Sequence, residues 1–214
     1  MLPETNWLHE LLSSLKTPGV EIVGGGTNML HNSIYNKTFA AFWYFRDSLK
    51  NTDEFEIKST FWANNFAARR DLLIKYPFPN IRPMFRMSCI FLAQKLRDAG
   101  TTIYRNNKAK VYHPPPNGIN HFMVRALIEG HDSQMARKLF NHKTRYHKIP
   151  FPIKNCYRAA RSIYQIIISR KAVNLAFIEL PIAFSIAVSY QFFVCLGEFT
   201  AIINPKLING NLRI

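Results

Sequence analysis

The chain has 214 residues, a length that suits one domain with a substantial hydrophobic core. Hydrophobic residues make up 48% of it and aromatic residues 14%, a composition that excludes a largely disordered protein. The net charge of +15, from 28 Lys and Arg against 13 Asp and Glu, indicates a polyanionic partner such as anionic lipid, a diphosphate or nucleic acid. The cysteines are widely spaced and contain no C-x-x-C pair, which argues against a disulfide framework or a zinc site.

The first part of the chain shows helical and strand patterns in turn. Thr5 is a plausible N-cap for a predicted helix that carries apolar residues at helical spacing from Trp7 to Leu15 and that Thr17–Gly19 stops. Val20–Val23 predicts a short strand, and Gly24–Gly26 predicts either a flexible turn or a loop whose backbone approaches a ligand closely. The aromatic residues of Met29–Phe45 predict a helix buried on one side, with core packing and an acceptor-lipid groove as the two interpretations.

Two asparagines and two arginines stand out in Phe61–Asp71, which reads Phe-Trp-Ala-Asn-Asn-Phe-Ala-Ala-Arg-Arg-Asp. Asn64 and Asn65 can both donate and accept hydrogen bonds, and they tolerate left-handed backbone angles. Arg69 and Arg70 begin a predicted helix, where a guanidinium group either neutralises a diphosphate through bidentate hydrogen bonds or forms an ordinary salt bridge. These four residues are the candidates for substrate binding.

The next segment predicts a helix followed by two strands. The helix is amphipathic, with its apolar side chains within Ile90–Leu96 and Gly100 as its C-terminal stop. Strand-forming residues then predict two short strands, Thr101–Tyr104 and Lys108–Tyr112, separated by an Asn106–Asn107 turn.

His113 follows the second of these strands and precedes three prolines, which hold the chain extended and fix the direction of the His. A histidine in this position is either a metal ligand or an ordinary strand-end residue. A long amphipathic helix is predicted over Asn117–Phe140, and Glu129 and Asp132 belong to a polar cluster on it. That cluster is either a solvated helix face or part of a segment that closes over an acceptor.

The order and spacing of three segments, Phe61–Asp71, Met87–Gly100 and Ala109–His113, resemble the C-terminal half of the catalytic domain of family 2 glycosyltransferases. In that family, which has the GT-A fold, a loop of the form (G/A)-N-x-A-x-R-R meets the acceptor side of the sugar-donor site. A helix then ends in R-L-R-x-A-G, and a strand leads to A-x-V-x-H. The resemblance covers residues 1–132 and implies an α/β fold: a partial GT-A domain with a Rossmann-like mixed sheet.

The resemblance also implies an activity and roles for the candidate residues. Enzymes of this family transfer a sugar from a nucleotide diphospho-sugar, here to an envelope or lipid-linked acceptor. The four candidate substrate-binding residues would lie at the acceptor or diphosphate side of the site. His113 would bind the divalent metal, Mg²⁺ or Mn²⁺, that neutralises the departing diphosphate in the complete enzyme.

Two departures from the family pattern bear on catalysis. Ser88 and Cys89 occupy the position of the family's Glu-Asp pair, whose carboxylate acts as general base toward the acceptor hydroxyl. Glu129 and Asp132 are the nearest downstream acids and the alternative candidates for that base. The metal-binding D-x-D motif is absent, and Pro3–Leu8 resembles the segment that directly follows it. We therefore expect the nucleotide-binding half upstream of this sequence, so that the chain alone is a truncated and inactive form.

The C-terminal third changes from basic to apolar. Residues 133–178 contain ten Lys or Arg and no acid, and Leu180–Gly197 contains eighteen residues without a charge. A basic block beside an apolar block is typical of a cytoplasmic juxtamembrane segment. We predict a basic juxtamembrane segment at 133–171, a membrane-associated or transmembrane helix at 172–205 and a tail at 206–214. A buried C-terminal helix is the alternative for the apolar segment.

These observations lead to three hypotheses about function. The first is a membrane-associated glycosyltransferase with its catalytic side in the cytoplasm, whose donor-binding half is absent or comes from a partner subunit. The second is a non-catalytic membrane adaptor derived from a transferase half. The third, a nucleic-acid-binding protein, is disfavoured, because the basic residues cluster beside the apolar segment instead of on a recognisable module.

Overall fold

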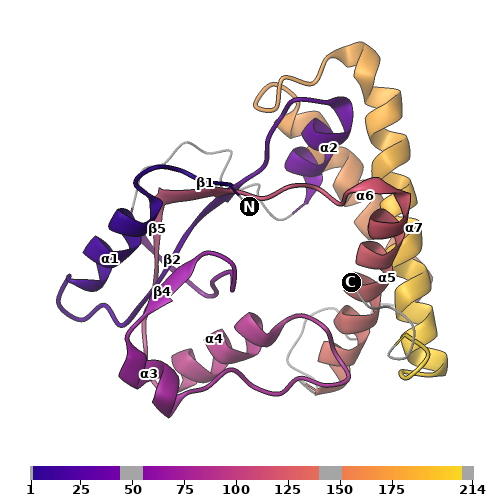
Figure 1. Cartoon of the computed structure of the whole chain (residues 1–214). Coiled ribbons are helices and arrows are strands. Elements are labelled where there is room, and N and C mark those ends of the chain that lie inside the picture. Colours follow the sequence, from indigo (N-terminus) through magenta and orange to yellow (C-terminus); the bar gives the residue numbers. More distant parts are fainter. Residues whose placement is uncertain (1, 44–54, 140–150, 209–214) are drawn as a thin grey trace. The chain divides into compact units, whose positions relative to one another are not determined.

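A computed structural model describes residues 2–43, 55–139 and 151–208 (Figure 1). These residues form two compact units, each described here by itself. The sheet unit draws on residues 1–30, 47–81 and 87–113, and the helical unit draws on residues 31–46, 82–86 and 114–214. The predicted α/β class with a mixed sheet is confirmed, whereas a GT-A identity stays a prediction.

The sheet unit is built on one mixed sheet with the strand order β1-β5-β2-β4, and β3 also pairs with β5. Its strands are β1 (Leu2–Pro3), β2 (Ile22–Asn28), β3 (Phe55–Lys58), β4 (Phe66–Ala68) and β5 (Ile103–Tyr112). β2 and β5 run parallel, while β1, β3 and β4 run antiparallel to their partners. The carboxyl ends of β2 and β5 therefore meet at the same edge of the sheet.

Helices cover both faces of this sheet (Figure 1). They are α1 (Trp7–Leu15), α3 (Arg70–Lys75) and α4 (Ser88–Asp98). Ile22 and Val23 follow each other in β2, so their side chains point to opposite faces. Ile22 packs in one core cluster with Leu92 and Leu96 of α4, and Val23 packs in a second cluster with Leu11 of α1. The apolar spacing that predicted these helices therefore supplies a core on each side of the sheet.

Gly24–Gly26 lie inside β2 and are buried, so the predicted turn after Val23 is wrong. The register between β2 and β5 shifts between Gly25 and Gly26. At this bulge a Cβ on Gly25 would lie only 2.2 Å from the carbonyl oxygen of Ala109 in β5. Glycine is needed here because the bulged backbone of β5 approaches β2 too closely for any side chain.

The predicted Asn106–Asn107 turn is also wrong, since β5 continues through both residues. Both asparagines are buried at the bulge, where their side chains replace part of the strand ladder. The Asn106 Oδ1 accepts from the Lys108 amide at 2.9 Å, and its Nδ2 donates to the Ser14 hydroxyl of α1 at 3.0 Å. Turn-forming residues can therefore occupy a bulge in a strand as well as a turn between strands.

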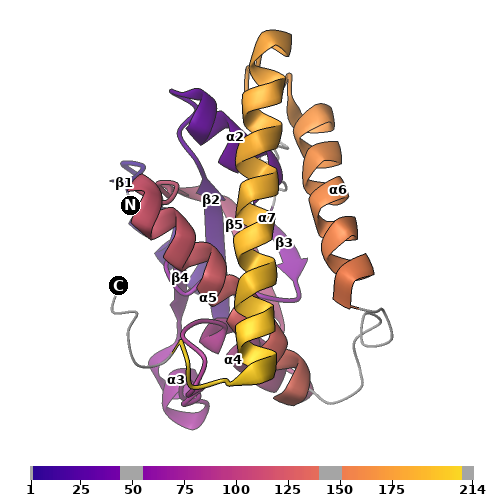
Figure 2. The same ribbon diagram turned by 90° about the vertical axis from the view of Figure 1, so that its right-hand side faces the viewer.

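The helical unit consists of α2 (Ile34–Phe42), α5 (Gly118–Leu139), α6 (Phe151–Ser169), the short 3-10 helix η2 (Phe177–Glu179) and α7 (Leu180–Ile203). Figure 2 shows α6 and α7 side by side, with α2 and α5 behind them. α5 and α7 approach closely at Gly130 and Gly197. A Cβ on Gly130 would lie 1.9 Å from the Val194 carbonyl oxygen, and a Cβ on Gly197 would lie 2.0 Å from that of Leu127.

The aromatic residues of α2 pack in the core of the helical unit. Phe39 is fully buried. Its ring centroid lies 5.4 Å from that of Tyr190 on α7 and 6.1 Å from that of Phe122 on α5, both with edge-to-face geometry. Of the two interpretations of this aromatic segment, core packing holds for Phe39. Tyr44 and Phe45 lie outside the described residues.

Within the described ranges, one helix, Phe177–Ile203, is long and apolar enough to cross a membrane by length and composition. It falls within the segment 172–205, for which the sequence predicts a membrane-associated helix. The buried-helix alternative also has some support, because α7 packs against α2, α5 and α6.

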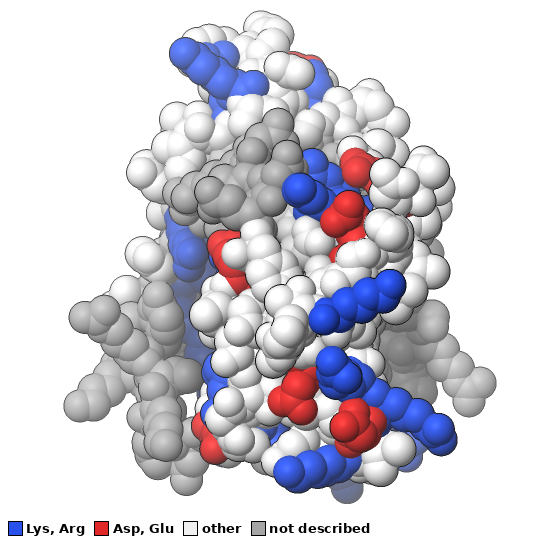
Figure 3. Space-filling model, turned by 90° about the vertical axis from the view of Figure 1, so that its left-hand side faces the viewer, with Lys and Arg blue, Asp and Glu red and all other residues white. Residues whose placement is uncertain are grey.

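Charged side chains of both signs lie next to one another on the face shown in Figure 3. The basic side chains gather in several places on this face, with uncharged surface between those places. Proteins that bind nucleic acid present a basic patch or stripe. The side chains drawn in this view do not form such a stripe.

Candidate functional site

His113 lies at the carboxyl edge of the parallel pair β2–β5. Its backbone amide donates to the carbonyl oxygen of Asn28, the last residue of β2, at 2.8 Å. Open α/β sheets bind their ligands outside the carboxyl ends of parallel strands. The residue is partly exposed. The structure thus places this predicted metal ligand at the edge where such a sheet binds ligands, and the metal-binding role itself stays a prediction.

Asn65, predicted to bind substrate, is buried against the β2–β5 bulge. Its side-chain amide donates to the carbonyl oxygens of Gly26 at 2.8 Å and Ala109 at 3.2 Å. Its Oδ1 accepts from the indole of Trp7 at 2.7 Å. These contacts hold the bulge and the loop before β4 together from inside. Asn64, by contrast, is exposed in that loop.

We expect Asn65→Asp to destabilise the sheet unit more than Asn65→Ala. The alanine variant loses buried hydrogen bonds, at a cost of about 2 kcal/mol. The aspartate variant also turns a carboxylate oxygen toward the two carbonyl oxygens that now accept from the amide, which adds the cost of a buried charge. Urea unfolding followed by tryptophan fluorescence measures both. Asn64→Asp, at the exposed neighbour, should leave the midpoint unchanged, and equal midpoints for the two Asn65 variants would contradict this account.

Arg69 and His113 lie at opposite ends of strand β2. Its backbone amide donates to the carbonyl oxygen of Glu21, just before β2, at 2.9 Å, and its guanidinium donates to that of Leu15, the last residue of α1, at 3.2 Å. About 23 Å of extended chain separates Glu21 from the end of β2 that holds His113. Arg70 is the first residue of α3 and is exposed. The structure therefore does not bring the arginine pair together with His113.

Ser88 and Cys89 form the first turn of α4, after Met87, whose φ of 82° is left-handed. Cys89 is buried in the core cluster that contains Leu92 and Leu96. Burial raises the pKa of the Cys89 thiol, so the thiolate is disfavoured. This environment is typical of an inert core cysteine and does not favour Cys89 as a replacement for the catalytic carboxylate.

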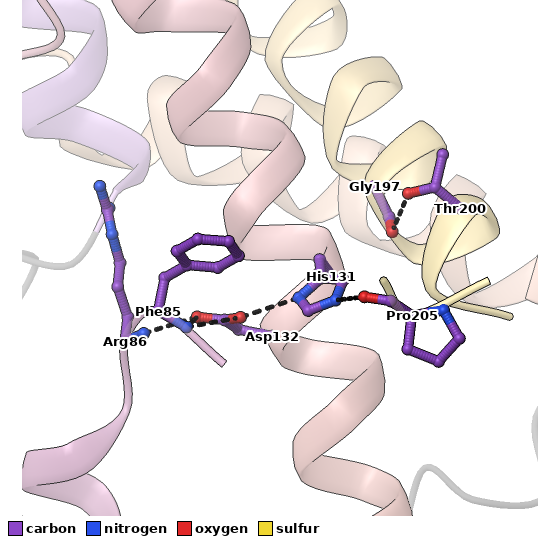
Figure 4. Close-up of polar contacts among 7 residues, drawn as sticks. All are labelled: Phe85, Arg86, His131, Asp132, Gly197, Thr200 and Pro205. Carbon is purple, nitrogen blue, oxygen red and sulfur yellow. Dashed lines mark hydrogen bonds and ion pairs between the residues drawn. The ribbon is translucent and has the colours of Figure 1, made fainter. Parts of the chain in front are cut away.

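Asp132 is buried in α5 and holds the segment that precedes α4 (Figure 4). Its carboxylate accepts from the backbone amides of Arg86 at 2.7 Å and Phe85 at 3.1 Å. The Nδ1 of His131 lies 3.0 Å from the same carboxylate, and its Nε2 lies 3.0 Å from the carbonyl oxygen of Pro205, beyond α7. The pair therefore joins three segments of the helical unit, which favours a structural role for Asp132 over that of a general base.

The stability contribution of Asp132 should depend on pH. Burial raises the pKa of its carboxyl above the usual range, against the lowering effect of His131 and of the Phe85 amide. The folded state therefore holds the proton more tightly than the unfolded state, so stability falls as pH rises from the unfolded pKa to the folded one.

Relative to Asp132→Asn, the free energy of unfolding of the wild type should fall across this pH window and then level off. Chemical unfolding at a series of acidic to neutral pH values measures the difference. If the wild type instead gains stability over Asp132→Asn as pH rises, the pKa of the Asp132 carboxyl is not raised by folding.

Glu129, the other alternative acid, lies between α5 and α7. Its Oε2 accepts from the Tyr190 hydroxyl at 2.8 Å and from the Trp43 indole at 3.4 Å. The guanidinium of Arg125 stacks over the Trp43 ring, 4.8 Å from its centroid. This carboxylate therefore belongs to the contact between helices and does not lie on a fully solvated helix face.

Sequence reasoning missed a buried ion cluster around Glu198, which directly follows the uncharged segment Leu180–Gly197. The Glu198 side chain is fully buried. Its carboxylate oxygens lie 2.5 Å from the Nζ of Lys154 and 2.6 Å from the guanidinium of Arg158, both on α6. The Arg137 guanidinium of α5 lies 3.9 Å away. The i, i+4 spacing of Lys154 and Arg158 puts both cations on one face of α6, but it does not indicate their partner.

Among the described side chains, no group of three or more His, Cys, Asp or Glu is arranged to hold a metal ion. In comparisons with known proteins, no family model, curated protein or solved structure matches this chain.

Proposed function

We propose that the chain is the acceptor-side part of a family 2-like glycosyltransferase, which transfers a sugar from a nucleotide diphospho-sugar to an envelope or lipid-linked acceptor. The position of His113 at the carboxyl edge of β2 and β5 carries the proposal, because α/β sheets bind nucleotide ligands at this edge. The resemblance of residues 64–70 and 96–113 to the family supports the same class.

The candidate residues divide into two groups within the proposed enzyme. His113 acts at the diphosphate side, and the exposed Asn64 and Arg70 are available for contacts with a ligand. Asn65 and Arg69 hold residues 64–70 in place, because their side chains donate hydrogen bonds to backbone carbonyl oxygens of β2 and α1. The Mg²⁺ or Mn²⁺ expected for the complete enzyme would take further ligands from the donor-binding half.

A fusion of this chain to the donor-binding half of an active family 2 enzyme tests the proposal. The fusion, assayed with labelled nucleotide-sugars and a lipid extract, should transfer sugar, whereas the chain alone should not. His113→Ala should lower transfer by about 100-fold, the cost of removing one group that stabilises developing charge. His9→Ala, at an exposed histidine of α1, is the matched control and should retain the activity.

The burial of Cys89 favours a second candidate, a non-catalytic membrane adaptor, because no carboxylate occupies the family's base position. The same assay separates the two functions. Inactive fusions, alongside parent enzymes that remain active, would support the adaptor. An active fusion that tolerates His113→Ala would support a transferase but remove His113 from its site.

A further inference from the structure

α6 buries several polar side chains and exposes several apolar ones, although Ile166 is also buried and Arg161 is exposed. Its buried polar residues are Lys154, Ser162, Gln165 and Ser169. Its exposed large apolar or aromatic residues are Ile153, Tyr157, Tyr164, Ile167 and Ile168. The surface helix of a water-soluble protein has the opposite arrangement, with its apolar stripe toward the core. The outward face of α6 is therefore suited to an apolar environment.

α7 also differs from the surface helix of a water-soluble protein, because it buries several small side chains and exposes many large apolar ones. The buried positions that face its neighbours include the small residues Ala183, Ala187, Gly197 and Ala201. The exposed positions include the large apolar residues Ile182, Phe192, Leu196, Phe199 and Ile203. Small residues at helix contacts with large apolar residues outside are typical of helices that pack against each other in lipid.

The two helices form one layer of the helical unit, and α2 and α5 lie on its other side (Figure 2). The inner side of α7 is occupied by α5 along the contact at Gly130 and Gly197. Lipid can therefore reach α7 from its outer side only. A layer with one apolar side and one protein-covered side suits a helix pair that lies along a membrane surface.

Charge and aromatic residues indicate which kind of membrane fits this layer. Residues 151–203 contain five Lys or Arg and two acids. The buried Glu198 pairs with Lys154 and Arg158, which leaves Arg161, Arg170 and Lys171 against Glu179. The surplus positive charge complements anionic lipid headgroups. The exposed Tyr157 and Tyr164 combine an apolar ring with a polar tip, as side chains at a membrane–water interface do.

We propose that the outward faces of α6 and α7 form a monotopic membrane-binding surface, which sinks into one leaflet of an anionic bilayer with both helix axes along the membrane plane. α6 is thereby a second lipid-contacting helix beside α7. This proposal does not depend on the glycosyltransferase function.

Flotation of the whole protein with lipid vesicles tests the surface. Binding to vesicles of phosphatidylcholine with phosphatidylglycerol should exceed binding to phosphatidylcholine alone by about tenfold, and salt should reduce it. Ile167→Glu on α6 and Phe192→Glu on α7 should each lower the partition coefficient by about tenfold or more. Ile74→Glu, at an equally apolar side chain that is 68% exposed on α3, should not change it.

Two results of this assay would overturn the proposal. If Ile167→Glu binds vesicles as the wild type does, α6 does not contact lipid. If the protein fails to float and forms a dimer that Phe192→Glu dissociates, a second copy of the chain covers the surface. Circular dichroism of each variant establishes that it has folded before its binding is compared.

Depth measurements separate a helix in the membrane plane from one that spans the bilayer. A fluorophore is attached to a cysteine introduced at Ile182, Phe192 or Ile203, in a background with Cys156 and Cys195 changed to alanine. Lipids that carry quenchers at different depths then report the position of each site. Similar shallow depths at all three sites are expected. A deep central site between two shallow ends would show that α7 spans the bilayer and would overturn the proposal.

Discussion

Replacing Gly130 with alanine is expected to destabilise the helical unit by about 3 kcal/mol, because the added methyl has no room. Its carbon would lie 1.9 Å from the Val194 carbonyl oxygen, and backbone atoms cannot turn aside as a flexible side chain can. α5 and α7 would have to move apart along their contact. That movement would also disturb the reciprocal approach of Gly197 to the Leu127 carbonyl. Thermal unfolding followed by far-ultraviolet circular dichroism measures the effect.

Gly118→Ala provides a comparison for this prediction. Gly118 has a φ of +76°, and a Cβ there would meet no atom within 4 Å. Alanine at this position therefore adds backbone strain of about 1 kcal/mol without a steric clash. If Gly130→Ala is no less stable than Gly118→Ala, then α5 and α7 are not in close contact at this glycine.

Replacing Glu198 with alanine is expected to cost about 3–5 kcal/mol, because it leaves buried cations without their shared anion. Lys154 is 2% exposed and has Glu198 as its partner at 2.5 Å. The free-energy cost of removing the Lys154 ammonium from water is offset only while the Glu198 carboxylate is present. Chemical unfolding in detergent or in vesicles gives the loss, and it should greatly exceed that of Glu179→Ala, which removes a partly exposed ion pair with Lys37.

A double-mutant cycle isolates the pair. Lys154→Met removes the most deeply buried cation and keeps an apolar stem of similar length. Combined with Glu198→Ala, it should recover part of the lost stability, because Arg158 is partly exposed and can turn toward solvent. Additive losses would show that the two charges do not interact in the folded protein.

The elements with strong local periodicity could be predicted from the sequence. The helix predicted after an N-cap at Thr5 is present as Trp7–Leu15, with Asn6 at the N-cap position, and the long helix predicted over Asn117–Phe140 is present as Gly118–Leu139. The apolar segment that contains Leu180–Gly197 forms a single long helix. In each case the helical signal lies in residues a few positions apart, so it requires no knowledge of distant partners.

The β2–β5 bulge could not be predicted in the same way. Gly24–Gly26 and Asn106–Asn107 each have a local preference for turns, and each preference is overridden by the other segment. Gly25 is needed because Ala109 approaches it, and Asn65 is buried because it binds the carbonyl groups of both strands. Contacts between residues so far apart along the chain are not visible in either local pattern.

The candidate site could likewise be predicted only in part from the sequence. The position of His113 after a strand was evident from the sequence, but the parallel partner that makes this strand end an expected ligand-binding edge was not. Arg69 and Asn65 are near in sequence, yet β4 runs antiparallel to β2 and carries Arg69 toward the opposite edge. Strand direction depends on sheet pairing, so a motif that predicts a residue cluster does not fix which end of the sheet its residues reach.

The central position of β5 affects how the sheet unit folds during synthesis. β5 pairs with β1, β2 and β3, although it is the last of the described strands to leave the ribosome. Until residues 103–112 have emerged, β2 and β4 are the only partners among these strands that can pair with each other, and a two-stranded ribbon alone is marginal in water. Residues 2–102 therefore cannot complete this sheet before β5 emerges, and we expect a nascent chain that stops before Ile103 to be a substrate for chaperones and proteases.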